Sequence, residues 1–336
     1  MEQPILSIII PVYNVEMYIE RCINSIVSQK PYLQNKIEII LIDDGSIDSS
    51  GEICDELADK YVGITVLHKK NGGLSFARNT GIKASKGKYI QLLDSDDTLE
   101  PDALELIISA LINEPDILIC RFNEIDLKNG AKKECSYHLN RDIVVTSKGE
   151  MLLEQIITGR TYNWYAWINV ISSHFLKENN LYFNEGRCFE DVLWTPKIIN
   201  EARSVNYLDK PIYNYYINRS GSITKQISEK VYRDKINAVR FIKDFCLKNN
   251  FSKQLSDKMM GNMSQIYVSL LADSRLFSAE KRNRYLEDIK KYDLCLKYSP
   301  QKYKRILYKL ELLIGINGVS YVLHKRAQYV RRKNNI

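Results

Sequence analysis

Three carboxylates fall within four residues at Asp94-Ser95-Asp96-Asp97, directly after the apolar run 89–93. Carboxylates this close repel one another unless something neutralises them. Mg²⁺ or Mn²⁺ can do so, because such a cation needs few protein carboxylates when it also binds phosphate oxygens. A solvated turn that caps a helix explains the pattern about equally well. The apolar run favours the metal, since a buried strand would fix the carboxylates at the edge of a sheet.

Two other polar clusters follow apolar runs. Asp43-Asp44-Gly45-Ser46 could accept hydrogen bonds from a base or ribose, although an Asx-turn with a helix cap is the commoner use of such residues. Asn71-Gly72-Gly73 precedes a helical pattern that carries Arg78, and a glycine pair at a helix start can present backbone N–H groups to phosphate. A plain loop and cap is an equal alternative for the second cluster.

A third carboxylate pair, Glu190-Asp191, lies between Phe189 and Trp194. Adjacent side chains diverge by ~100° on a helix, so one carboxylate can face a cleft while the other forms a structural ion pair. A carboxylate that is partly desolvated can serve as a general base. Two cap or surface acids are the commoner outcome for such a pair.

The aromatic stretch Tyr162–Trp167 includes Trp164 and Tyr165. Rings with a polar tip suit the face of a sugar, but aromatic residues more often belong to a core. We expect one of the two tryptophans in the core and keep the other as a candidate for a groove.

The elements that must position these residues alternate along the chain. The patterns predict strands at 6–12, 37–42, 64–68, 89–93 and 116–121, with helices at 15–29, 50–61, 74–84 and 101–113. This order predicts a mostly parallel sheet with helices on both faces. Ligands bind beyond the carboxyl ends of such strands, so the polar clusters at strand ends should gather on one rim. These clusters are Tyr13-Asn14, Asp43-Asp44 and Asp94 to Asp97. Residues 124–148 predict a loop or hairpin, 148–157 a helix, 162–225 irregular structure, and the chain from 228 onward helices.

Composition excludes several classes of protein. The chain has 336 residues, 45% of them hydrophobic and 26% charged, which excludes disorder as a whole and suggests about two domains. Seven scattered cysteines without a C-x-x-C pair indicate reduced thiols rather than disulfides or zinc. No uninterrupted apolar run approaches the roughly 18–20 residues that span a bilayer, and the N-terminus does not resemble a signal peptide. We therefore expect a cytoplasmic protein.

The formal charge of +7 is unevenly distributed. Residues 281–336 contain 15 Lys and Arg against 4 Asp and Glu, a net charge of +11, so residues 1–280 carry −4. The apolar stretch 312–323 lies inside this basic tail. It predicts either an amphipathic helix that docks on an anionic membrane surface or a core helix with a solvated basic end. Nucleic acid is not an expected partner, since no motif for reading bases accompanies the charge.

Taken in order, these segments resemble the family 2 glycosyltransferases, inverting enzymes of the GT-A type, and most nearly the bacterial enzymes that build capsule, exopolysaccharide or O-antigen chains. The resemblance covers about residues 5–225. It is carried by LSIIIPVYN (6–14), IEIILIDDGSIDSS (37–50), NGGLSFARNTGIKASKGKYIQLLDSDD (71–97), FEDVLW (189–194) and NRSGSIT (218–224). It implies a GT-A nucleotide-sugar-binding fold over 1–225, with a nucleotide-sugar half (1–115) and an acceptor half (116–225). A helical extension follows at 226–336.

The resemblance also implies a role for each matching position. Asp191 would be the catalytic base, and Asp96 with Asp94 would bind Mn²⁺ or Mg²⁺. The residues expected near the nucleotide sugar are Pro11, Tyr13, Asn14, Asp44, Arg78, Asp94, Asp97 and Arg219.

The implied reaction moves one sugar from a nucleotide sugar, by family habit a UDP-sugar, to a hydroxyl of a glycan or lipid-linked glycan. The Q-x-x-R-W motif of processive members is absent from the sequence, which predicts one sugar per encounter. A non-catalytic membrane- or polyanion-binding protein on the same fold is the alternative function. The retained carboxylates Asp44, Asp94, Asp96 and Asp191 argue against it.

Overall fold

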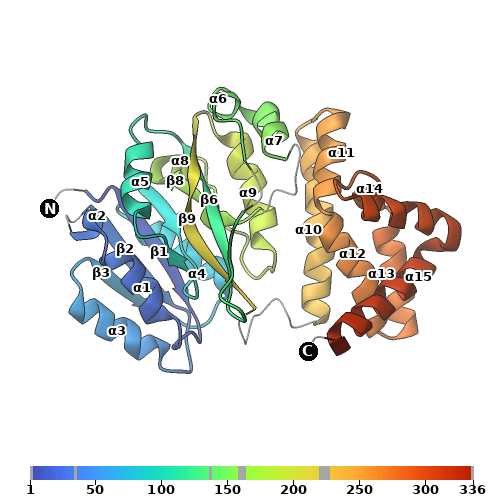
Figure 1. Ribbon diagram of the computed structural model, residues 1–336, viewed down its shortest axis with the longest axis horizontal. Coiled ribbons are helices and arrows are strands. Elements are labelled where there is room, and N and C mark those ends of the chain that lie inside the picture. The colour runs from blue at the N-terminus through green and yellow to red at the C-terminus, as the bar shows by residue number, and fades with distance from the viewer. Residues whose placement is uncertain (1–2, 34–35, 136–137, 158–163, 219–227, 334–336) are drawn as a thin grey trace. The chain divides into compact units, whose positions relative to one another are not determined.

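The computed structural model describes residues 3–33, 36–135, 138–157, 164–218 and 228–333. These residues form two compact units (Figure 1). The last strand of the first unit is β9 (Val205–Ile217), and the helices of the second unit start with α10 (Glu229–Lys248). Ile157, at the end of the earlier helix α7 (Gly149–Ile157), also belongs to the second unit. The domain boundary expected at residue 225 lies outside the described residues.

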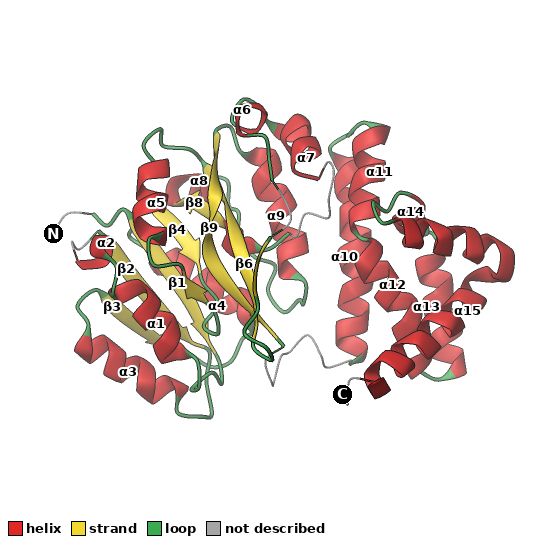
Figure 2. Cartoon of the chain, in the orientation of Figure 1, coloured by secondary structure: helices red, strands yellow, loops and turns green. Residues whose placement is uncertain are grey.

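Four parallel strands form the first half of the sheet in the order β3-β2-β1-β4. Their bounds are β1 (Leu6–Val12), β2 (Ile37–Asp43), β3 (Ile64–His68) and β4 (Tyr89–Leu92). Every residue of β1 is buried, as expected for an apolar strand covered on both faces. Helices α1 (Ile19–Val27), α2 (Lys30–Leu33), α3 (Ser50–Lys60) and α4 (Leu74–Ala84) connect these strands (Figure 2).

The second half of the sheet is mixed. Strand β8 (Asn169–Ser172) runs antiparallel to β4 and to β6 (Ile117–Asp126), whereas β6 and β9 are parallel. The short strand β5 (Thr98–Leu99) pairs antiparallel with β9, and β7 (Lys132–Glu134) forms the predicted hairpin with β6. Helices of this half are α5 (Ala103–Ala110), α6 (Arg141–Val144), α7 (Gly149–Ile157), α8 (Ser173–Glu178) and α9 (Glu190–Glu201).

The expectation of irregular structure across 162–225 is wrong for the described part of that range. It contains β8, α8, α9 and the 13-residue strand β9. Polar residues and Pro211 interrupt the apolar alternation of β9, and its register with β6 shifts between Cys120 and Phe122. Pairing with β6, rather than a strong local pattern, therefore makes this segment a strand.

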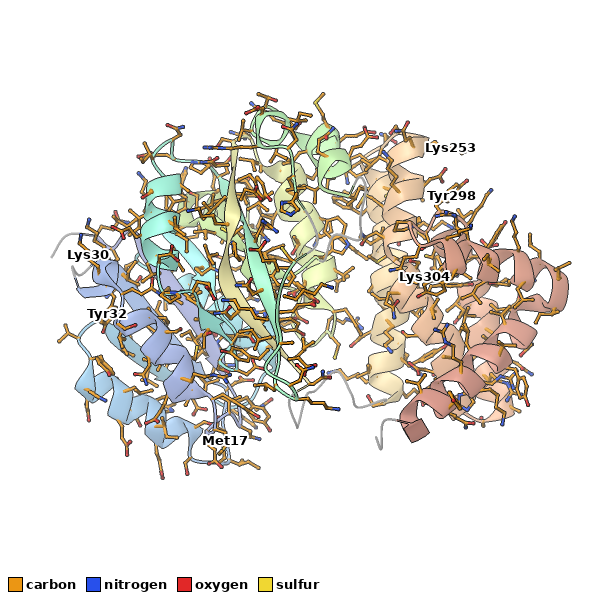
Figure 3. The ribbon with its side chains drawn as sticks, viewed as in Figure 1. Met17, Lys30, Tyr32, Lys253, Tyr298 and Lys304 are labelled. Carbon is orange, nitrogen blue, oxygen red and sulfur yellow. The ribbon has the colours of Figure 1, made fainter. Side chains whose placement is uncertain are left out.

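The second unit is helical, as predicted. Its helices are α10, α11 (Lys253–Asn262), α12 (Ser264–Asp273), α13 (Ala279–Lys290), α14 (Leu294–Lys297) and α15 (Lys302–Lys333). The Tyr232 hydroxyl, buried in this unit, donates to the Leu270 carbonyl at 3.0 Å. Lys304, labelled in Figure 3, is also buried here.

Helix α15 is broken at Gly315, whose φ of 71° and ψ of 166° are not helical. Within the described residues, the segment Lys302–Val330 is the one helix whose length and composition would allow it to cross a membrane, and 22% of its most apolar window is buried. Counting uninterrupted apolar runs missed this segment, because Asn317 and two glycines break the run without removing its average apolar character.

Candidate active site

Three polar clusters follow three adjacent parallel strands: Tyr13-Asn14 follows β1, Asp43-Asp44 lies at the end of β2, and Asp94 to Asp97 follow β4. Val12 at the end of β1 pairs with Asp43 at the end of β2, and the Asp44 N–H donates to the Val12 carbonyl at 2.9 Å. On the other side of β1, the Leu93 N–H donates to the Ile9 carbonyl at 3.0 Å, just before Asp94. The clusters therefore share the carboxyl edge of the sheet, where α/β proteins bind ligands.

The segment after β1 holds three expected nucleotide-binding residues. Pro11 is buried in the strand, Tyr13 is 42% exposed, and Asn14 is exposed with a left-handed φ of 52°. The Asn14 side chain accepts from the Ile47 N–H at 2.9 Å, and its own N–H donates to Ser46 Oγ at 3.2 Å. These bonds fix the turn after β1 against the turn after β2 and leave the Tyr13 ring accessible.

Asp43 and Asp44 have different roles. Asp43 accepts from the Ser46 N–H at 3.0 Å, as in the Asx-turn alternative, and pairs with His68 Nδ1 at 2.9 Å. Asp44 is 3% exposed and accepts from Lys69 Nζ at 2.6 Å and from the N–H groups of Gly72 and Gly73 at 2.9 and 2.7 Å. A carboxylate has about four acceptor positions. Asp44 thus shapes the glycine loop and retains capacity for one further donor.

Arg78 occupies the centre of the site. Its side chain is 1% exposed, and its guanidinium contacts Asp94 Oδ1 at 2.8 Å, Glu190 Oε1 at 3.0 Å and Asp191 Oδ1 at 2.9 Å. These three carboxylates come from the end of β4 and the start of α9. Arg78, which we expected near the nucleotide sugar, thus has its guanidinium engaged by three carboxylates of the protein. It joins the acidic turn to the candidate base.

The segment before Asp191 is held tightly. The Asn79 side chain donates to the Phe183 carbonyl at 3.0 Å and accepts from the Phe183 N–H at 2.9 Å. Phe189, the residue before helix α9, has a left-handed φ of 61°, a conformation that costs a bulky residue of order 1–3 kcal/mol. Such a cost is tolerated where surrounding contacts impose the conformation, as Arg78 and Asn79 do here.

Asp191 has the properties of a general base at neutral pH. Its side chain is 18% exposed, so it is largely buried but remains partly accessible to solvent. Burial is the main influence on the pKa of Asp191 and raises it, and the charges of Glu190 and Asp94 also raise it. Arg78 lowers this pKa. The net result is a pKa of about 7. A carboxylate with that pKa exchanges a proton readily near pH 7.

The carboxylates of the acidic turn differ in how deeply they are buried. Asp97, which we expected near the nucleotide sugar, is 1% exposed and accepts from the Tyr213 hydroxyl at 2.7 Å and from the Tyr216 N–H at 2.8 Å. It therefore anchors the turn to β9. Burial, with the charges of Asp96 and Asp94, raises the pKa of Asp97. Asp94 and Asp96 are less buried. They are therefore the carboxylates of this turn that a ligand can reach.

This donor set fits a divalent cation that also binds phosphate. In the part of the chain that the structure describes, no group of three or more His, Cys, Asp or Glu side chains could hold a metal alone. Mg²⁺ and Mn²⁺ at phosphate sites use one or two carboxylates together with phosphate oxygens and water. Asp94 and Asp96 supply that number, and Arg78 already compensates part of their charge.

The remaining sequence expectations have mixed outcomes. Arg219 lies outside the described residues. Trp164 and Trp167 are 4% and 2% exposed, so the idea that one of them lines a groove is wrong: both belong to the core.

Sequence reasoning did not single out several residues that shape the site. Arg21 donates to the Asp96 carbonyl at 2.7 Å and lies 3.8 Å over the Tyr216 ring, and Tyr213 holds Asp97. Lys69 forms a further ion pair, with Asp44. Only Lys69, two residues before Asn71 and the glycine pair, carried a local signal. Arg21 and Tyr213 reach the site from α1 and β9, through contacts that sequence spacing does not reveal.

Comparison with known proteins identifies a shared family and fold. Residues 7–170 match the family described as "Glycosyl transferase family 2". The glycosyltransferase EpsJ of Bacillus subtilis (strain 168) is 38% identical over 215 residues, which are 63% of this chain and 61% of EpsJ. The chain thus aligns with less than two thirds of that relative. The putative glycosyltransferase EpsH of the same organism is 30% identical over 74% of this chain and 71% of EpsH.

A similar solved structure is that of S. aureus TarS, residues 1–349, in complex with UDP-GlcNAc. It has a TM-score of 0.68 and 18% sequence identity, and the match covers 96% of this chain and 91% of that one. The similarity shows a common GT-A-type fold with additional C-terminal helices.

Proposed function

The chain belongs to glycosyltransferase family 2, and we propose that it transfers one sugar from a nucleotide sugar to a hydroxyl of a glycan or lipid-linked glycan, inverting the anomeric carbon. The observation that carries this proposal is the bridge through Arg78. One guanidinium contacts Asp94 of the acidic turn at 2.8 Å and Asp191 at 2.9 Å. A donor held at the turn and an acceptor held at Asp191 would therefore meet within the reach of one side chain.

On the donor side, Pro11, Tyr13, Asn14 and Asp44 border the nucleotide, with Arg219 near the diphosphate. Asp94 and Asp96 would hold Mn²⁺ or Mg²⁺, which when bound offsets the charge that develops on the diphosphate leaving group. Arg78 and Asp97 hold the acidic turn in place through their contacts with the rest of the first unit. A UDP-sugar is the proposed donor, supported by the TarS structure with UDP-GlcNAc.

On the acceptor side, Asp191 removes the proton from the attacking hydroxyl. The hydroxyl oxygen forms a bond to the anomeric carbon as the bond from that carbon to the diphosphate oxygen breaks on the opposite face. The proton stays on Asp191 until solvent removes it. Partial exposure and a pKa of about 7 suit this role, because the carboxylate is basic yet ionised in a substantial fraction at neutral pH.

We further propose that the enzyme acts without processivity, in the assembly of a surface polysaccharide at the cytoplasmic face of the membrane. The second unit supports membrane docking. Leu312, Leu313 and Ile314, next to the break at Gly315, are 68%, 81% and 48% exposed. They lie in the part of the chain with a net charge of +11. Apolar side chains surrounded by Lys and Arg are typical of segments that bind anionic lipid surfaces.

Donor binding tests the metal and nucleotide assignments. Isothermal titration with UDP-sugars and GDP-sugars, in Mn²⁺ and after removal of metal by chelation, should show metal-dependent binding of a UDP-sugar. Asp96→Ala should abolish the metal dependence. Asp102→Ala, which removes an exposed carboxylate at the start of α5, is the matched control and should bind as the wild type does. Unchanged Mn²⁺-dependent binding in Asp96→Ala would contradict the metal assignment.

Vesicle flotation tests membrane docking. The full chain should float with vesicles that contain anionic phosphatidylglycerol and remain behind with neutral vesicles. The double change Leu312→Ser and Leu313→Ser should abolish flotation. Leu247→Ser is the control, because Leu247 on α10 is also 66% exposed. Equal loss in both variants, or no loss in either, would refute docking through this segment.

A further inference from the structure

A row of aromatic rings lies on the sheet beside the acidic turn and Asp191. Phe122 on β6 pairs with Tyr213 on β9, and Glu124 pairs with Tyr215 two residues further along. Side chains two residues apart on a strand point to the same face. Phe122, Glu124, Tyr213 and Tyr215 therefore share one face of the β6–β9 pair.

Two more rings extend this row from the residues before β8. The Trp167 ring stacks on Tyr213 with centroids 4.1 Å apart, and Tyr165 stacks on Trp167 at 4.7 Å. Tyr165 and Tyr215 are tilted toward each other at 5.6 Å. Trp167 and Tyr213 are buried, whereas Tyr165 and Tyr215 are only partly buried. The stack is thus part of the core at one end and accessible at its two outer tyrosines.

Two carboxylates lie near these tyrosines: Glu124 is paired with Tyr215 across the two strands, and Asp191 forms a hydrogen bond with the backbone of Ala166, the residue after Tyr165. Burial raises the pKa of the Tyr165 hydroxyl, and the charges of Glu124, Asp191 and Asp97 act in the same direction. Burial also raises the pKa of Tyr215 to about 12, with Asp97, Asp94, Asp96 and Glu124 contributing. The rings therefore lie in the electrostatic field of both the acidic turn and the candidate base.

We propose that Tyr165, Tyr215 and Glu124 form the subsite that binds the acceptor sugar ring, an inference that rests on the proposed function and names the residues that deliver its acceptor. A pyranose has an apolar face of C–H groups and a rim of hydroxyls. The partly exposed rings of the two tyrosines would contact the C–H groups, and Glu124 would accept from rim hydroxyls. Asp191 then faces the hydroxyl that attacks.

Core packing accounts for only part of this arrangement. Trp167 and Tyr213 need no other explanation, because a buried stacked pair stabilises the sheet. Tyr165 and Tyr215 extend the stack into a partly exposed region next to Asp191 and Glu124, where an apolar side chain would serve packing equally well. The phenol rings and adjacent carboxylate instead fit a ligand with both apolar and hydroxyl surfaces.

Saturation-transfer NMR tests the subsite without requiring turnover. The probes are the methyl β-glycosides of glucose, galactose and N-acetylglucosamine, with and without UDP and Mg²⁺. The wild type should transfer saturation to C–H protons on one face of at least one glycoside. Tyr165→Ala and Tyr215→Ala should each weaken that binding about tenfold, the loss expected for a stacking contact of ordinary strength. Tyr165→Phe, which keeps the ring, should restore most of it.

Tyr61→Ala is the matched control, since Tyr61 is a partly buried tyrosine at the end of α3. It should bind the glycoside as the wild type does, and the Kd for UDP should be unchanged in every variant, which confirms that each is folded. No signal from any glycoside, or equal losses of glycoside and UDP affinity, would overturn the subsite. A wild type that binds no nucleotide sugar but shows a Tyr165-dependent glycoside signal would refute the proposed function alone.

Discussion

The two units of this protein differ in how their contacts compensate a buried positive charge. Arg78 in the first unit and Lys304 in the second are each 1% exposed. Arg78 is surrounded by Asp94, Glu190 and Asp191 at 2.8–3.0 Å. The Lys304 ammonium donates to the neutral Ser264 hydroxyl at 3.2 Å, and burial lowers its pKa to about 8.

Arg78 is a buried charge that belongs to the candidate site, whereas Lys304 is a buried charge that lowers the stability of the fold. A buried charge needs compensation, and the first unit supplies it with the same carboxylates that we assign to metal binding and proton transfer. The second unit leaves Lys304 weakly compensated, and burial also raises the pKa of Glu311 on the same helix to about 7. We therefore expect changes at the Arg78 cluster to affect activity and folding together, and changes at Lys304 to affect folding alone.

The largest expected effect follows Asp191→Asn. The amide keeps the oxygen that accepts from Arg78 but cannot take a proton, so turnover should fall by about 10²–10⁴-fold with donor binding retained. Glu190→Gln is the matched control, because it changes the neighbouring partner of the same guanidinium in the same way. Initial rates of sugar transfer, measured for both variants, test this prediction. Comparable turnover in the two would remove Asp191 from the mechanism.

Arg78→Ala should come next, because it leaves three carboxylates together without their cation. The loss of one partner from a buried ion pair costs about 3–5 kcal/mol of unfolding free energy. Urea denaturation measures it. Arg203→Ala, an exposed arginine of the same unit, should shift the unfolding free energy by no more than about 0.5 kcal/mol. A stable Arg78→Ala protein would show that the cluster is less interdependent than its geometry indicates.

Lys304→Met should stabilise the protein by roughly 2 kcal/mol at pH 7, since it removes a buried charge and keeps the side-chain volume. The folded pKa of about 8 lies below the ordinary value of 10.5. The charged ammonium is therefore disfavoured in the folded state, and its cost to stability is fully present below pH 8 and disappears as the pH rises to 10.5. The advantage of Lys304→Met over the wild type should shrink between pH 8 and 10.5. Lys302→Met, an exposed lysine of the same helix, should show no such trend.

The smallest effect concerns pH. Because Asp191 acts as a base only when ionised, kcat/KM should rise with pH through about 7 and be about tenfold lower at pH 6 than at pH 8. Glu190 helps to raise this pKa, so Glu190→Gln should move the acid limb of the profile to lower pH. A profile that is flat from pH 6 to 8 would contradict the assignment of the base.

The sequence was most informative where local patterns and tertiary structure agree. Helix α4 spans Leu74–Ala84 and strand β3 spans Ile64–His68, with the bounds that their patterns predicted. Strand β9 was missed, because its polar positions lack a clear alternation and its pairing with β6 is a long-range contact. The burial of Arg78 and Asp97 was not predicted, because it depends on elements far along the chain.

By itself, the sequence determined the class of fold, the approximate ranges of the parallel strands along the chain and the position of each polar cluster after a strand. These features follow from periodicity and from turn residues, which are local properties. Only the tertiary structure decided which carboxylates are accessible and which are buried against hydrogen-bond donors of the protein. Asp44, Asp97 and Arg78 each find partners 16 or more residues away, and the free energy of burying a charge depends on those partners rather than on its neighbours in sequence.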